Sequence, residues 1–246
     1  MFSLFFRPSP DSEDILIAEL WECGTAGIVE EDGGIRAFFE DPGLLNHFDA
    51  YAPEVREEEP TDWAQVTRDA WPAMAIGQRF FLAPPWCPEP TPPGRLRLPI
   101  HPGMACGTGR HPATQLALEA IEQYVRPGDC VVDVGTGSGI LAAAAALIGA
   151  AKVIGCDVDP EAVGIARERV SIPMFVGSAG AIRSRCADVV IANIDAATIE
   201  DLAAEFARVR KPDSTLILTG FPEWNSPEGF DVKRMLQREE WLCLVC

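Results

Sequence analysis

The stretch VVDVGTGSGI, residues 131–140, constrains the fold of this chain more than any other feature. A short apolar run typical of a buried strand leads directly into Gly135, Gly137 and Gly139, and an apolar helix pattern follows. A glycine-rich turn between a strand and a helix lets ligand atoms approach the backbone, and it points the helix N-terminus at them. The sequence therefore predicts a ligand site at this turn.

Strand and helix patterns alternate around the turn from His101 onward. We expect strands over residues 130–135, 152–158, 187–194 and 214–220, and helices over residues 112–124, 140–150, 160–170 and 197–210. Alternation of this kind favours a parallel sheet with helices on both faces. We therefore predict an α/β protein with a Rossmann-like, doubly wound sheet.

The N-terminal part follows a different order of elements. It shows a candidate strand over residues 2–8, a helix pattern that ends at Gly24, a hairpin pattern over residues 26–39 and a short helix pattern over residues 41–48. This order favours a small α+β domain of ferredoxin-like type.

An acidic segment marked by prolines, residues 51–63, then suggests a linker or a last edge strand. We place the N-terminal domain at residues 1–58, a linker at residues 59–70 and the larger C-terminal domain at residues 71–246.

Charge is unevenly distributed along the chain, whose formal net charge is −17. Residues 1–62 carry sixteen Asp and Glu against three Arg, a net charge of −13, whereas the remaining 184 residues carry 21 acids and 17 bases, a net charge of −4. An acidic field disfavours direct binding of nucleic acid and favours a basic partner, although such charges can also serve only to keep a surface hydrated.

The sequence has no feature that indicates secretion or a membrane. The N-terminus meets Arg7 and two prolines too early for a secretory signal, and the longest apolar run, residues 140–151, is too short to span a bilayer. The eight cysteines show no dense framework, and the close pair Cys243 and Cys246 lacks a second pair of ligands. We expect a cytoplasmic protein without a metal site.

The spacing of the three glycines separates two classes of ligand. Dinucleotide-binding turns follow the pattern G-x-G-x-x-G, and Ile140 stands where that pattern needs a small residue. The spacing G-x-G-x-G, preceded by Asp133 and followed by Asp157 at the end of the next strand, favours S-adenosylmethionine, because a carboxylate there can accept hydrogen bonds from both ribose hydroxyls. An ordinary strand-to-helix connection is the plainer alternative, and a nicotinamide enzyme is the least favoured.

Several spaced blocks of sequence carry a more specific resemblance. The block PGMACGTGRHPATQLALEAIE, residues 102–122, is followed by the glycine turn, by GCDVDP and by VVIANI, and closing blocks LILTGF and REEW come later. Together these blocks resemble the ribosomal protein L11 methyltransferase family, whose loop reads P-G-M-A-F-G-T-G-T-H-P-T-T. The resemblance extends from about Asp62 to Trp241.

The resemblance implies a class I S-adenosylmethionine-dependent methyltransferase with a small N-terminal domain that recognises the substrate. It implies methyl transfer to lysine side chains and to the N-terminal amine of ribosomal protein L11 or another basic protein. We expect a monomer. Asn193 and Ile194 would orient the accepting amine. The cofactor-binding residues implied by the resemblance or by the glycine pattern are Thr114, Gly135, Asp157, Asn193, Gly137, Thr108, His111 and Asp133. For His111, a helix-start residue bonded to backbone is an equal alternative.

Some positions depart from the family pattern. Cys106 replaces a Phe, Arg110 replaces a Thr, and Asp195 stands where the family has an apolar residue. The segment ARERVSIPMF, residues 166–175, also lacks the family's N-x-x-x-N-G block, which shortens the adenine side of the pocket. Two alternatives therefore remain open, a methyltransferase for another amine and a binding module without turnover.

Overall fold

The structure is a computed structural model that describes residues 1–8, 13–31, 33–44, 47–57, 69, 71–101, 109–223 and 230–246. Its internal contacts divide the chain into two compact units, Met1–Asp69 and Ala70–Cys246. The predicted linker, residues 59–70, lies almost entirely outside the described residues. The assignment of these units as functional domains therefore stays a proposal.

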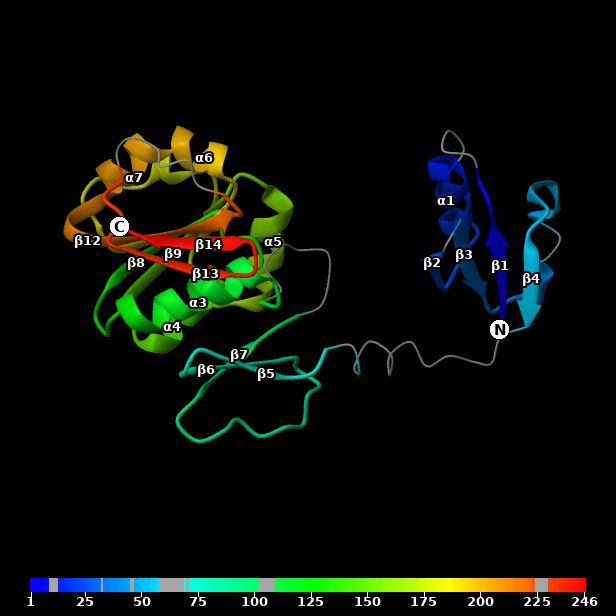
Figure 1. Ribbon diagram of the computed structural model, residues 1–246, viewed down its shortest axis with the longest axis horizontal. Helices are drawn as coiled ribbons and strands as arrows, with labels where there is room; N and C mark the ends of the chain where they lie inside the picture. The colour runs from blue at the N-terminus through cyan, green and yellow to red at the C-terminus, as the bar shows by residue number, and fades with distance from the viewer. Residues whose placement is uncertain are drawn as a thin grey trace. The chain divides into compact units, whose positions relative to one another are not determined.

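The described residues of the smaller unit form a four-stranded antiparallel sheet with one helix (Figure 1). Its elements are β1 (Phe2–Phe6), α1 (Glu13–Glu22), β2 (Gly27–Glu31), β3 (Gly34–Phe39) and β4 (Glu54–Glu57). The strand order is β2-β3-β1-β4, which is the ferredoxin-like order. Alternate residues of β1 and β3, among them Leu4, Phe6 and Phe39, pack with Leu16 and Leu20 of α1 in one core. The predicted α+β domain is confirmed.

One detail of this unit differs from the sequence prediction. The short helix expected over residues 41–48 is replaced by two 3-10 turns, η1 (Pro42–Leu44) and η2 (Asp49–Tyr51). The Asp41 carboxylate accepts a hydrogen bond from the Gly43 N–H at 2.8 Å, and such a local bond competes with the hydrogen bonds of an α-helix. Within segment 51–63, the alternative of a last edge strand is confirmed for Glu54–Glu57, because β4 pairs with β1 at the edge of the sheet.

The larger unit is built on a seven-stranded sheet. Its strands are β8 (Cys130–Val134), β9 (Lys152–Asp157), β10 (Met174–Val176), β11 (Ala187–Asn193), β12 (Arg210–Phe221), β13 (Arg234–Arg238) and β14 (Trp241–Val245). They lie in the order β10-β9-β8-β11-β12-β14-β13. The strands from β10 to β12 are parallel, and β14 and β13 complete the sheet in antiparallel pairs. This is the predicted Rossmann-like, doubly wound arrangement.

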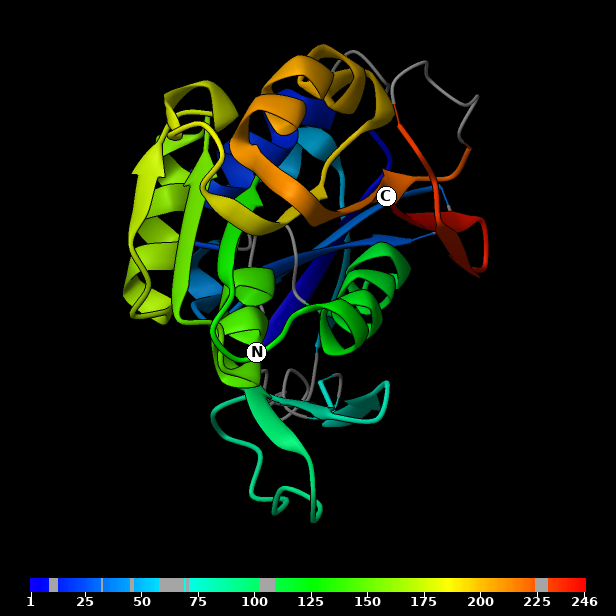
Figure 2. The same ribbon diagram turned by 90° about the vertical axis from the view of Figure 1, so that its left-hand side faces the viewer.

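Helices cover both faces of this sheet (Figures 1 and 2). The helices are α3 (Pro112–Tyr124), α4 (Ile140–Ile148), α5 (Pro160–Arg169), α6 (Ala196–Asp201) and α7 (Ala203–Val209), with a 3-10 turn η3 (Ala179–Ala181). Helices α3 and α4 pack on one face, with α5 beside α4, and α6 and α7 pack on the other. The single helix expected over residues 197–210 is divided at Leu202, and β10 was not predicted.

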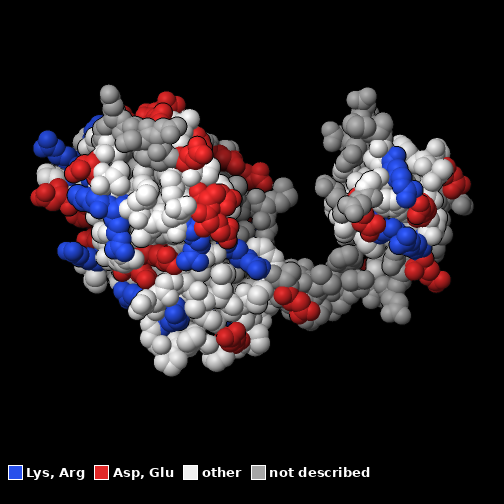
Figure 3. All heavy atoms as spheres, viewed as in Figure 1, with Lys and Arg blue, Asp and Glu red and all other residues white. Residues whose placement is uncertain are grey.

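Charged side chains of both signs are interspersed on the visible face of the larger unit (Figure 3). This agrees with the small net charge of its part of the sequence. The larger unit therefore presents no single-sign surface on this face.

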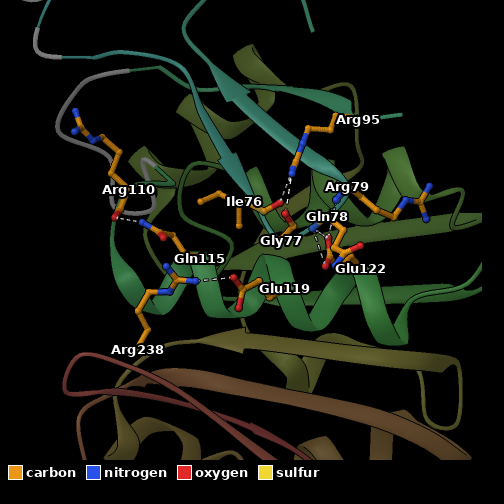
Figure 4. A network of polar contacts seen from close by, with 10 residues as sticks. All are labelled: Ile76, Gly77, Gln78, Arg79, Arg95, Arg110, Gln115, Glu119, Glu122 and Arg238. Atoms are coloured by element: carbon orange, nitrogen blue, oxygen red, sulfur yellow. Dashed lines mark hydrogen bonds and ion pairs between the residues drawn. The ribbon is translucent and has the colours of Figure 1, made fainter. Parts of the chain in front are cut away.

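A small third sheet, formed by β5 (Met74–Ile76), β6 (Phe80–Ala83) and β7 (Leu96–Pro99), joins the larger unit through α3. Glu122 of α3 points into the turn between β5 and β6 (Figure 4). Its carboxylate accepts hydrogen bonds from the backbone N–H groups of Gln78 and Arg79 at 2.9–3.1 Å. This contact attaches the turn between β5 and β6 to α3.

The strand order of the main sheet reverses direction at β8, which has β9 on one side and β11 on the other. In open parallel sheets, ligands bind at the carboxyl ends of the strands beside such a reversal. The topology therefore predicts a ligand site among the residues that follow β8, β9, β10 and β11.

Candidate functional site

A cavity of about 340 Å³ opens at the carboxyl ends of these four parallel strands. Small-molecule sites typically occupy a few hundred Å³. The cavity is lined by Val134, Gly135, Gly137, Asp157, Val158, Gly177, Ser178, Asn193, Ile194, Asp195, Thr198 and Leu202. The cavity thus includes the glycine turn, the end of the next strand and the start of α6, at the place that the strand order indicates.

The glycine turn has a backbone that only glycine adopts readily. Gly135, Gly137 and Gly139 have φ angles of +70°, +52° and +80°. A side chain on Gly135 would also collide with Cγ2 of Ile194, and one on Gly139 would lie 2.8 Å from Cγ2 of Val170. Gly135 and Gly137 line the cavity, as the sequence predicts, whereas Gly139 packs against α5 and begins α4.

Asp133 lies beneath the turn and is fully buried. One carboxylate oxygen accepts hydrogen bonds from the Thr136 hydroxyl at 2.7 Å and from the Ala142 N–H at 3.1 Å. Burial raises the pKa of this carboxyl to about 6, against the lowering effect of those two bonds. Asp133 is not among the residues that line the cavity, so in this structure it supports the turn from below.

Asp157 ends β9 and lines the cavity. One carboxylate oxygen accepts a hydrogen bond from the Gly137 N–H at 2.9 Å, and the other accepts one from the Asp159 N–H at 3.1 Å. An ionised carboxylate has about four acceptor positions. Two of them are used by the backbone, which leaves two for the hydroxyl groups of a ligand.

Asn193 ends β11 and lines the cavity from the opposite side of the turn. Its side-chain amide donates a hydrogen bond to the Thr114 hydroxyl at 3.2 Å. Thr114 belongs to α3, is only 1% exposed, and lies behind Asn193 and outside the cavity lining. Because the amide N–H₂ is held by Thr114, the amide oxygen Oδ1 is the group of Asn193 that is suited to accept from a ligand.

Ile194 lies between two glycines. Its side chain lies against Gly135, and its backbone lies against Gly220, whose φ is +104°. The Ile194 N–H donates to the Thr219 carbonyl at 3.0 Å. These contacts leave little room for the backbone of Ile194 to move, so its carbonyl has a defined position beside Asn193.

The two remaining predicted residues lie in or next to the segment before α3. The Nδ1 atom of His111 accepts a hydrogen bond from the Ala113 N–H at 3.2 Å, which makes His111 the N-cap of α3. Its ring also contacts Trp241, with centroids 4.3 Å apart. Thr108 lies outside the described residues.

Sequence reasoning missed part of the cavity. Val158, which is 74% exposed, directly follows Asp157 and would have been found by continuing one residue past the strand end. Gly177 and Ser178 follow β10, a strand of only three residues that shows no clear pattern. They form the side of the cavity where the sequence predicted a shortened wall, so β10 still encloses that side.

The described residues contain neither a metal-binding cluster nor a membrane-spanning helix. No group of three or more His, Cys, Asp or Glu in the described part of the chain could hold a metal ion. Within the same residues, no helix is both long and apolar enough to cross a membrane.

Comparisons with known proteins agree on one family. The family model of ribosomal protein L11 methyltransferase (PrmA) matches residues 39–246. The chain is 37% identical over 223 residues to the ribosomal protein L11 methyltransferase of Deinococcus radiodurans, covering 85% of this chain and 81% of that protein. It is also 37% identical over 202 residues to the Burkholderia vietnamiensis protein of the same name, covering 78% of this chain and 67% of that protein.

A solved structure gives the same result. The crystal structure of ribosomal protein L11 methylase from Lactobacillus delbrueckii subsp. bulgaricus superimposes with a TM-score of 0.65 at 26% sequence identity. The match covers 71% of this chain and 97% of that one. The similarity therefore extends through most of the chain and is not confined to the glycine turn.

Proposed function

The chain belongs to the ribosomal protein L11 methyltransferase family, and from that premise we propose that it transfers methyl groups to amino groups of ribosomal protein L11, on lysine side chains and at the N-terminal amine. The cofactor is S-adenosylmethionine, as for the family. The observation that carries the proposal is that the consecutive residues Asn193 and Ile194 line the same cavity as the glycine turn and Asp157.

The residues of the cavity suit this cofactor. Gly135 and Gly137 allow the methionine part to lie against the backbone, and the free acceptor positions of Asp157 suit the two ribose hydroxyls. Val158 and Ser178 offer an apolar and a polar contact for the adenine end. When bound, S-adenosylmethionine supplies an activated methyl group on a positively charged sulfur, so the protein need not activate a leaving group.

The acceptor side of the cavity suits an amine. An amine nitrogen that donates N–H bonds to Asn193 Oδ1 and to the Ile194 carbonyl has its lone pair directed away from both. Holding that lone pair in line with the bond to be broken lowers the barrier by several kcal/mol through proximity and orientation. Thr114 acts as a positioning residue, because it fixes which face of the Asn193 amide is presented.

The accepting amine must also lose a proton before it reacts. A free lysine side chain titrates near about 10.4, so it is almost wholly protonated at neutral pH. Transfer of the side chain from water into a confined cavity disfavours the charged form. The released proton passes to water, and Asn193 and Ile194 then orient the neutral amine by accepting its two N–H bonds.

The test is methyl transfer to purified L11 with labelled S-adenosylmethionine, followed by mass spectrometry to locate the modified amines. We expect label on lysine side chains and on the N-terminal amine. Asn193→Ala should lower kcat by about 10²-fold, because the lone pair loses its orientation. A matched control is Gln237→Ala, which removes a side-chain amide from an exposed position of β13, outside the cavity lining, and should leave the rate unchanged.

Two other results would change the proposed function. Label on other proteins of a lysate but not on L11 would mean that the enzyme is a methyltransferase for another amine. Binding of the cofactor without any transfer would support a module that binds without turnover.

A further inference from the structure

The acceptor end of the cavity carries a charge that the proposed function does not use. Two of the residues that line the cavity are charged, Asp157 and Asp195, and both are carboxylates. Asp157 is at the end assigned to the ribose. Asp195 directly follows Ile194, so its negative charge lies beside the groups that receive the amine.

The Asp195 carboxylate is held in a fixed place. It caps the N-terminus of α6, since one oxygen accepts a hydrogen bond from the Thr198 N–H at 2.9 Å and the other accepts one from the Thr198 hydroxyl at 2.6 Å. The hydrogen bond from the Thr198 side chain is the main cause that lowers the pKa of Asp195. The group is therefore ionised at neutral pH, and its negative charge is fixed at the start of α6.

We propose that Asp195 is a specificity-determining residue that recognises the incoming acceptor as a cation, through an ion pair between its carboxylate and the ammonium form of the acceptor amine. This inference rests on the proposed function. It adds a preference for basic acceptors over neutral ones.

The ion pair assists capture of the acceptor and not the chemical step. A neighbouring negative charge favours the ammonium form, so it opposes the deprotonation that must precede transfer. A carboxylate with a lowered pKa is also a poor base. The contribution of Asp195 should therefore be seen in KM, with kcat unchanged or slightly higher when the charge is removed.

The alternative is that Asp195 only caps α6. Asp195→Asn separates the two roles, because asparagine caps helices about as well as aspartate but carries no charge. Asp201→Asn is the matched control. It removes the same charge from an exposed position of the same helix, outside the cavity lining.

The first readout is the steady-state methylation of L11. We expect Asp195→Asn to raise KM for L11 on the order of five- to ten-fold while kcat stays within about two-fold, since a partly dehydrated ion pair is lost. Raising the salt concentration should raise KM for the wild type and for Asp201→Asn, and much less for Asp195→Asn. An unchanged KM with an unchanged salt dependence would overturn the inference and leave the proposed function intact.

The second readout requires no turnover. Sinefungin carries an amine where S-adenosylmethionine carries its methyl group, and S-adenosylhomocysteine carries no group at that position. In calorimetric titrations, the wild type should bind sinefungin more tightly than S-adenosylhomocysteine, and Asp195→Asn should lose most of that difference in affinity. If L11 is methylated, the KM ratio decides the inference. If L11 is not methylated, the proposed substrate is wrong, and the difference in affinity between the two analogues decides the role of Asp195. Loss of that difference in Asp195→Asn supports the role. Persistence of the difference overturns it.

Discussion

At the scale of single residues, burial of one carboxyl group couples the glycine turn to pH. Asp133 is fully buried, and its pKa is raised from 3.8 to about 6. A carboxyl whose pKa is higher in the folded state stabilises the fold fully below the unfolded pKa, and that contribution is lost as the pH rises through the folded pKa. The free energy of unfolding should therefore carry a falling contribution from Asp133 around pH 6.

This can be measured as a difference between the wild type and Asp133→Asn. Because the isoelectric point is about 4.5, the useful range lies above it. From about pH 5.3 to pH 7.3 the free energy of unfolding of the wild type should fall by about 1 kcal/mol relative to the variant. Urea unfolding at several pH values gives both curves. A difference that is constant over this range, or that rises with pH, would contradict the assignment.

A second prediction concerns Gly135. Gly135→Ala places a side chain on a left-handed backbone and against Ile194. Gly128 also has a left-handed backbone, with a φ of +95°, but a side chain there would have no other atom within 4 Å. We expect Gly128→Ala to lower the free energy of unfolding by about 1 kcal/mol with no change in cofactor affinity. Gly135→Ala should weaken cofactor binding about ten-fold or more, because Ile194 must move.

The cause can be checked by a second substitution. Leucine has only one γ carbon, so Ile194→Leu in the Gly135→Ala background should recover part of the lost affinity in calorimetry. If the double variant binds no better than Gly135→Ala, the contact with Ile194 is not the reason for the loss.

At the scale of elements, the attachment of the small sheet to α3 gives a prediction about stability alone. Glu122→Ala removes the acceptor for the backbone N–H groups of Gln78 and Arg79. We expect the free energy of unfolding to fall by about 1 kcal/mol, with Glu122→Gln intermediate, since its one carbonyl oxygen can still accept. The dissociation constant for S-adenosylmethionine should not change. A ten-fold loss of affinity in Glu122→Ala would show that this sheet belongs to the cofactor site.

The sequence predicts some elements well and others poorly, for identifiable reasons. The strands β8, β9 and β11 are buried apolar runs bounded by polar or glycine residues, and their positions were predicted to within about a residue or two. The strand β10 has only three residues, too few for a periodic pattern. The division between α6 and α7 at Leu202 has no proline or glycine to mark it.

The sequence likewise predicts some residues of the candidate site well and others poorly. Asp157 and Asn193 were predictable because each ends a clear strand in a parallel sheet, where ligands bind. The hydrogen bond from Asn193 to Thr114 joins residues 79 positions apart and needed the fold to be known. For the same reason, the sequence could not separate Asp133, which lies under the turn, from the residues that line the cavity.

At the scale of the whole molecule, the two units have separate hydrophobic cores. Among the described residues, the core of the smaller unit is formed by residues up to Phe48, and the cores of the larger unit are formed by residues from Trp71 onward. All the described residues that line the cavity belong to the larger unit. We propose that the larger unit carries the chemistry and that the acidic smaller unit recognises the substrate.

A truncated chain tests this division. A fragment of residues 70–246 should bind S-adenosylmethionine with an affinity within about two-fold of the full chain, because it keeps every cavity residue. It should lose most of its activity toward L11 through a higher KM. Full activity of the fragment on L11 would contradict the role proposed for the smaller unit.

We propose that the cavity at the ends of β8, β9, β10 and β11 is the S-adenosylmethionine site. Calorimetric titration of the wild type and of Asp157→Asn, with NAD as the competing ligand class, tests it most directly. We expect one molecule of S-adenosylmethionine to bind per chain, no binding of NAD, and at least a ten-fold loss of affinity in the variant, since a charge-assisted hydrogen bond to ribose is removed. Equal affinity in the wild type and in the variant, or a preference for NAD, would contradict the account.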